Sequence, residues 1–131
     1  MISPLLHYVA CSLSMALPAL AVSISQGLTS LAAIMALNTQ PRAQGEISRT
    51  FILSMALIET SGILSFLLGF KLALMGAHIN HPSAAFIHYA ELGIVGAIGI
   101  TGCFSGIASC LPARQACLAV ARQPFFTNKI Q

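Results

Sequence analysis

Residues 50–64 read TFILSMALIETSGIL, an apolar run with one carboxylate, Glu59, near its centre. A run of this kind, with more apolar sequence on both sides, is typical of a membrane-spanning helix, which needs about 20 residues to cross the hydrocarbon. A charged side chain at that depth is costly and is rarely present without a use. Glu59 is therefore predicted to bind a transported proton or cation.

The composition of the whole chain favours an integral membrane protein. Of its 131 residues, 56% are hydrophobic and 7% are charged, a charge content too low for a soluble domain of this size. The net charge of +3 is too small and too scattered for a nucleic-acid surface. The sequence shows no catalytic triad, phosphate loop or nucleotide motif, so we predict no catalytic residues, no cofactor and no enzymatic activity of its own.

The apolar spans predict an all-α membrane protein that crosses the bilayer in several passes. Three runs are long enough to do so, at about residues 4–38, 48–75 and 83–121. The first two are expected to form a helical hairpin, and the third a further transmembrane helix. The predicted organisation is a hairpin with the ion site at 1–75, a connector at 76–82, and the third helix with a short tail at 83–131.

The positive charges predict how the chain is oriented. Arg42 and Arg49 flank the first connector, whereas Arg114, Arg122 and Lys129 lie toward the C-terminus. By the positive-inside bias, both of these regions are cytoplasmic, and the N-terminus and the second connector lie outside. Since no Lys or Arg precedes Arg42, the apolar N-terminus is expected to be an uncleaved first helix rather than a signal peptide. A bacterial plasma membrane is the simplest location.

An internal repeat relates the third span to the first. When residues 40–41 are aligned with residues 123–124, both reading QP, Ala36 meets Ala119 and Ile47 meets Ile130. The copy of the second span, which would carry a second acid, is absent. If copies of the chain assembled into a ring with an inner and an outer layer of helices, two copies of the first span for each second span would crowd the smaller inner layer. The third span is therefore expected to leave that layer, to pair with a missing helix, or to belong to a shortened chain.

Small residues predict close helix packing by the third span. Its glycines are spaced by three and four, which keeps them on one slowly drifting face: Gly93, Gly96, Gly99, Gly102 and Gly106. Glycine on such a face lets helix backbones approach closely in a membrane. The second span is bulkier, so it is expected to form a lipid-facing layer outside the other two.

Other ionisable and sulfur side chains are predicted to have structural roles. Glu91 is expected to cap the N-terminus of the third helix rather than to form a second ion site. His78 and His81 lie in the second connector without a nearby acidic or cysteine ligand. A stripe of cysteines spaced by seven also lacks partner ligands and favours packing over metal binding: Cys103, Cys110 and Cys117.

Together, these motifs resemble the c subunit (proteolipid) of rotary ATP synthases. That family has a small-residue first helix, a cytoplasmic Arg-Gln-Pro loop, and a second helix with a carboxylate in an Ala-x-x-Glu-Thr context. Here residues 56–60 read ALIET and residues 45–50 read GEISRT, similar to the sequence that follows the family's loop. The first loop reads TQP at 39–41, with Thr39 in place of the usual arginine, and residues 122–124 restore RQP.

The resemblance implies a rotor subunit that couples ion flow to rotation. Copies of the chain would form a ring in the lipid, beside a stator subunit that carries an essential arginine. Gln40, Pro41 and Arg42 in the first loop would touch the central stalk. At Glu59, desolvation favours the neutral carboxyl, whereas a cationic stator residue favours release of the bound ion.

The ion is predicted to be a proton, with Na⁺ as the alternative and no other metal. In sodium-type relatives, a first-helix Gln and a hydroxyl beside the Glu supply ligands. The resemblance thus implies four further ion ligands around Glu59: Gln26, Thr60, Ser61 and the carbonyl of Leu57. Those relatives also use a tyrosine about one turn past the Glu, and here that position is Leu64.

Two other functions remain open at this point. An oligomer of three-helix subunits could use Glu59 as the coupling carboxylate of a small ion-driven transporter. A structural relative of this rotor family that assembles but conducts nothing is the other possibility. The paired Gln-Pro loops favour the rotor, because a transporter has no evident need for them.

Overall fold

The structure, a computed structural model, describes residues 2–75 and 84–126. Within these ranges three long helices form: α1 (Ile2–Thr39), α2 (Gln44–Met75) and α3 (Ala84–Arg122). Each contains a segment long and apolar enough to span a bilayer. The predicted all-α integral membrane fold is therefore confirmed. The predicted connector at 76–82, with its two histidines, lies outside the described residues.

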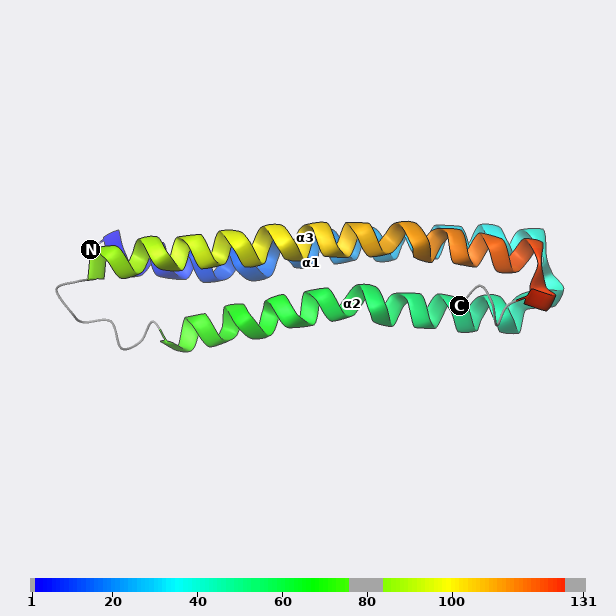
Figure 1. Ribbon diagram of the computed structural model, residues 1–131, viewed down its shortest axis with the longest axis horizontal. Helices are drawn as coiled ribbons and strands as arrows, with labels where there is room; N and C mark the ends of the chain where they lie inside the picture. Colours follow the sequence, from blue (N-terminus) through cyan, green and yellow to red (C-terminus); the bar gives the residue numbers. More distant parts are fainter. Residues whose placement is uncertain (1, 76–83, 127–131) are drawn as a thin grey trace.

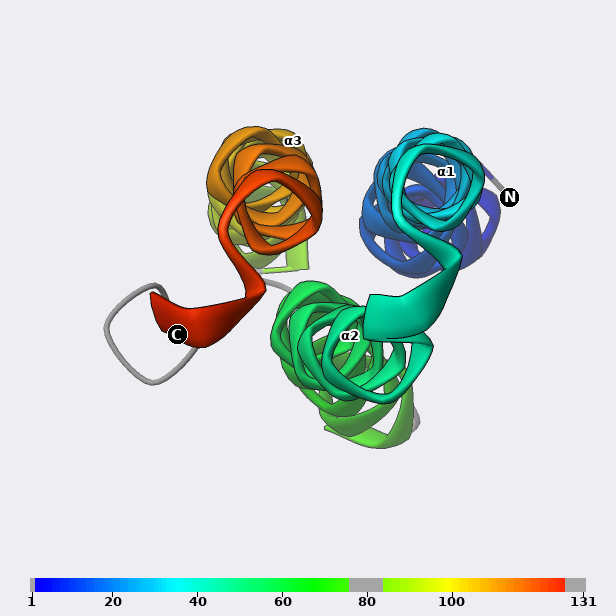
Figure 2. The ribbon, with the colours of Figure 1, turned by 90° about the vertical axis from the view of Figure 1, so that its right-hand side faces the viewer.

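The three helices pack as a triangular bundle. Helices α1 and α3 lie side by side and run in the same direction, while α2 runs the opposite way (Figure 1). Viewed along the bundle, α2 lies against both of the other helices (Figure 2). Within one copy, the third span thus lies beside the first, and its place in a ring stays a prediction.

Helices α1 and α3 end in the same way. The residue before a proline disfavours helical backbone angles, and Gln40 has a φ of −140° and a ψ of 77°. The Gln40 amide donates to the Ala36 carbonyl at 3.0 Å, and the Gln123 amide donates to the Ala119 carbonyl at the same distance. A short 3-10 turn follows each: η1 (Pro41–Ala43) and η3 (Pro124–Phe126). The two aligned QP sequences therefore have matching local structure at the same end of the bundle (Figure 2).

All three helices approach one another closely at Gly102 of α3. A Cβ atom there would lie 2.8 Å from Cγ of Pro18 in α1 and 2.5 Å from Oγ of Ser65 in α2. Only glycine fits at such a separation, so this position fixes the level at which the helices meet. Around Gly93 and Gly96, by contrast, a Cβ would meet no atom within 4 Å. Within one copy, Gly93 and Gly96 therefore take no part in the predicted packing face.

Glu91 does not cap α3. The helix begins at Ala84, and its first turn contains no acidic residue. Glu91 lies about two turns farther along, given 3.6 residues per turn. The predicted capping role is therefore wrong, because Glu91 lies well inside the helix rather than in its first turn.

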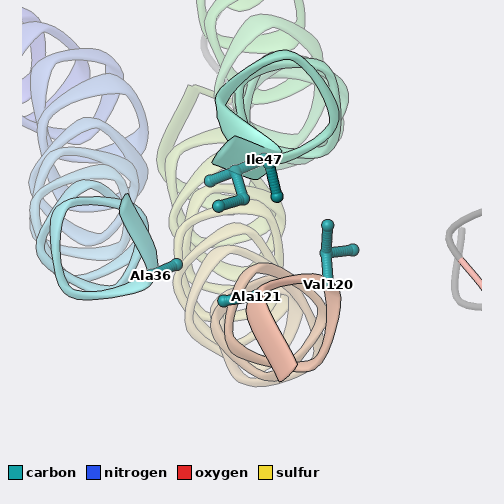
Figure 3. Close-up of a cluster of buried hydrophobic side chains, with 5 residues drawn as sticks. Ala36, Ile47, Val120 and Ala121 are labelled. Atoms are coloured by element: carbon teal, nitrogen blue, oxygen red, sulfur yellow. The ribbon is translucent and has the colours of Figure 1, made fainter. Parts of the chain in front are cut away.

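A small apolar cluster joins the helices at the end that carries the Gln-Pro turns. Ile47 points from α2 toward Ala36 of α1 and toward Val120 and Ala121 of α3 (Figure 3). Ala43 of η1 completes the cluster, and the side chains of Ile47 and Val120 are fully buried. This contact holds the first turn against α3.

Ile47→Val is expected to destabilise the bundle by about 0.5–1.5 kcal/mol, because it removes one buried methyl group. Ile52→Val removes the same group from α2 at a position that is 66% exposed, so it is the matched control. The free energy of unfolding in mixed micelles, measured by denaturant titration, should fall for the first variant and stay nearly constant for the second. Equal losses would show that the Ile47 contact contributes nothing special.

Candidate ion-binding site

Glu59 lies at the midpoint of α2 (Gln44–Met75). At about 1.5 Å per residue this helix is about 48 Å long, longer than the roughly 30 Å of a hydrocarbon core. When α2 is centred in a bilayer, Glu59 is near the middle and far from either headgroup layer. Glu46, the acidic residue in the first turn, lies near the start of the same helix.

A shallow groove of about 290 Å³ between α1 and α2 contains the side chain of Glu59. Gln26 and Ser23 of α1 line the same groove, and no residue of α3 is among its lining residues. Glu59 is exposed, and within the described residues its carboxylate has neither a hydrogen bond nor an ion pair. The arrangement is an unpaired acid on the outer flank of the bundle, with one amide side chain nearby.

The other predicted ligands lie on different flanks of α2. The Thr60 hydroxyl donates to the Leu57 carbonyl at 2.7 Å, and the Ser61 hydroxyl donates to the Ile58 carbonyl at 2.9 Å. Leu57 and Thr60 face α3, and Ser61 lines a further groove between α2 and α3. The structure thus brings Gln26 and Glu59 together, but it does not bring Leu57, Thr60 or Ser61 to them.

The groove that contains Leu57 and Thr60, called here the α2–α3 groove, has a volume of about 410 Å³. It was not anticipated from the sequence. Pairs of hydroxyl residues four apart in each helix were the signal that could have revealed it. The lining residues are Thr50, Leu53, Ser54, Leu57, Thr60, Ser105, Ser109, Pro112, Ala113 and Ala116.

The predicted stalk-contact residues lie in the turn between α1 and α2. Gln40 is half-buried, whereas Pro41 and Arg42 are exposed. The turn forms one tip of the bundle (Figure 1), so its side chains can reach another protein beyond the helices.

The cysteines of α3 are placed for packing. Cys110 and Cys117 are buried, and the Thr29 hydroxyl of α1 donates to the Cys110 sulfur at 3.7 Å. Across the described part of the chain, no three His, Cys, Asp or Glu side chains gather where they could hold a metal ion.

Comparison with known families agrees with this architecture. Residues 9–72 match the family described as the C subunit of ATP synthase. The match covers most of α1, the turn η1 and most of α2, and it includes Gln26 and Glu59. No curated protein matches the chain. Residues 9–72 of this integral membrane protein, slightly less than half of the chain, are thus similar to the ATP synthase C subunit family.

Proposed function

We propose that this chain is a membrane rotor subunit that carries one proton at a time on Glu59. The observation that carries the proposal is the unpaired Glu59 carboxylate, located at the midpoint of α2 inside the family-matched segment. Copies of the chain would form a ring in the membrane, beside a stator subunit with an essential arginine. Gln40, Pro41 and Arg42 at the tip would contact the central stalk.

The physical chemistry of Glu59 suits a carrier. A carboxylate without a partner is costly in hydrocarbon when ionised, and much less so when neutral. A cationic side chain from a stator reverses that preference, because an adjacent positive charge favours the ionised form. Glu59 would thus travel through lipid in its protonated form and release the proton next to the stator.

The surroundings of Glu59 favour a proton over Na⁺. A dehydrated hard cation needs several oxygen ligands at once. The groove offers the side-chain oxygens of Glu59, Gln26 and Ser23, whose hydroxyl donates to the Ala19 carbonyl at 2.8 Å and keeps lone pairs that can accept. Thr60 and Ser61 face other flanks of α2. The carboxyl of Glu59 alone suffices to hold a proton, whereas these three side chains are few ligands for sodium.

The test is modification of native membranes with a lipid-soluble carbodiimide, followed by mass mapping of the modified residues. Carbodiimides react with protonated carboxyl groups, so Glu59 is expected to be labelled and the exposed Glu46 of the same helix to remain unlabelled. Labelling of Glu59 should fall as the pH rises and the carboxyl ionises. It should not change when Na⁺ is added at constant pH and ionic strength.

The alternatives predict different labelling patterns. Protection of Glu59 by Na⁺ would identify a sodium carrier and overturn the choice of ion. Failure of Glu59 to react at any pH would contradict the carrier role altogether, because the side chain would then be permanently ionised or covered.

A further inference from the structure

The α2–α3 groove is polar within the membrane-spanning part of the bundle. Three hydroxyl residues of α2 and two of α3 line it: Thr50, Ser54, Thr60, Ser105 and Ser109. From Thr50 to Thr60 the groove extends for about 15 Å along α2, at 1.5 Å per residue. It therefore runs from near the Gln-Pro turns to the depth of the middle of the helix.

Ser54 has unsatisfied hydrogen-bonding capacity in this groove. Its side chain is 7% exposed and lines the groove, and within the described residues it forms no hydrogen bond. Within the described residues, the fully buried side-chain nitrogen or oxygen atom that lacks a partner is Nε of Arg114, so the Ser54 oxygen is reached from the groove, and hydroxyl groups in such places commonly bond to water. Of the other serines at comparable burial, Ser14 and Ser65 donate to carbonyls of their own helices, whereas the Ser25 side chain of α1 has no hydrogen bond within the described residues.

Pro112 of α3 lines the opposite wall of the groove and interrupts the hydrogen-bond pattern of its helix. Proline lacks an amide hydrogen, so Pro112 cannot donate to the carbonyl four residues earlier, that of Ala108. In membrane helices such a carbonyl is satisfied by a neighbouring helix, a serine or threonine side chain, a local change of helix geometry, or ordered water. The Thr60 and Ser109 hydroxyls donate to carbonyls of their own helices and keep oxygen lone pairs that can accept.

We infer that the α2–α3 groove holds a file of water molecules that reaches the depth of Glu59. Water both donates and accepts, so it can satisfy the Ser54 hydroxyl and donate to the hydroxyl oxygens of Thr60 and Ser109, which an acyl chain cannot. The volume of about 410 Å³ is ample, because one water in the liquid takes about 30 Å³. No charged side chain lines the groove to balance a bound cation.

The inference concerns hydration and does not depend on the proposed rotor function. Thr60, at the inner end of the groove, is the residue next to Glu59. The chain would thus bring water within one residue of its central carboxylate from the end of the bundle that carries the Gln-Pro turns.

The experiment compares two introduced cysteines in the full-length chain in native membranes. Ser109→Cys places a thiol in the groove, and Leu111→Cys places one at nearly the same depth of α3, at a position that is 62% exposed and lines no groove described above. The probe is a small cationic methanethiosulfonate that does not cross lipid, applied to membrane fragments open on both sides. Mass mapping separates these sites from the native cysteines.

We expect Ser109→Cys to be modified at least about tenfold faster than Leu111→Cys, because the reactive thiolate forms only where water is present. Adding Ala116→Leu, which narrows the groove on the side of the Gln-Pro turns, should slow the reaction at Ser109→Cys. Adding Ala97→Leu, at an exposed position outside the groove, should not.

Equal rates for the two cysteines would overturn the inference, since lipid or a second copy of the chain would then fill the groove. A fast reaction at Ser109→Cys that Ala116→Leu leaves unchanged would overturn it as well, because the water would then come by another route. Neither readout involves ion transport, so a failure here is distinct from a failure of the proposed function.

Discussion

Glu59→Gln is expected to reduce ion-driven ATP synthesis to background in membranes whose rotor contains only the variant chain. Glutamine has nearly the same size and shape as a protonated glutamate, so the groove between α1 and α2 should be unchanged. Its amide neither ionises nor releases a proton, so no ion can be loaded or unloaded. The measurement is ATP synthesis by membrane vesicles under an imposed pH gradient and potential.

Glu46→Gln is the matched control for this experiment. It makes the same chemical change in the same helix, but in the first turn and at an exposed position away from the middle of α2. Synthesis should continue with this variant. If Glu59→Gln membranes also kept their synthesis rate, Glu59 would not be the ion carrier, and a non-conducting structural role would become the better interpretation.

Gly102→Val is expected to destabilise the bundle by about 3 kcal/mol, at the upper end of the usual cost of overpacking. The new Cβ would overlap both the rigid ring of Pro18 and the hydroxyl of Ser65, so α3 must move away from two helices together. Helix α3 packs mainly on α1, and this shift should weaken the whole interface. Denaturant titration in mixed micelles measures the free energy of unfolding.

Gly96→Val in the same helix separates this packing effect from the intrinsic effect of valine in a helix. A Cβ at Gly96 would meet no atom within 4 Å in the chain, so the loss of stability should be small. Should the two variants prove equally stable, the close approach at Gly102 would not be needed for the fold. Loss of ring assembly by Gly96→Val alone would instead show that this face meets another copy of the chain.

The main features of the fold were predictable from hydropathy. Long apolar runs separated by Pro41 specify the hairpin, because proline removes a helical hydrogen bond and restricts the residue before it. The start of α2 was less predictable: the helix begins at Gln44 rather than near residue 48, since Gly45 is tolerated in a first turn. The position of α3 beside α1 depends on contacts such as Gly102 with Pro18, which join residues far apart in the sequence.

The candidate site was only partly predictable. Glu59 and Gln26 were expected together from the family resemblance, and they line one groove. Successive residues of a helix are rotated by about 100° because there are 3.6 residues per turn. In this structure Thr60 lines a different groove from Glu59, on the same flank as Leu57, three residues earlier. Its hydroxyl bonds its own helix, a local alternative that sequence motifs do not reveal.

The number of helices per copy has a consequence for energy conversion in the proposed rotor. Each copy contributes three long helices, and of its three acids only Glu59 lies at the middle of a helix. Packed helices lie about 8–10 Å apart, so the third helix widens the ring without adding an ion. A ring of three-helix copies would transport fewer ions per revolution than a ring of two-helix hairpins with the same circumference. Fewer ions would then cross the membrane for each ATP made. The proposed rotor would therefore suit membranes that maintain a high electrochemical gradient.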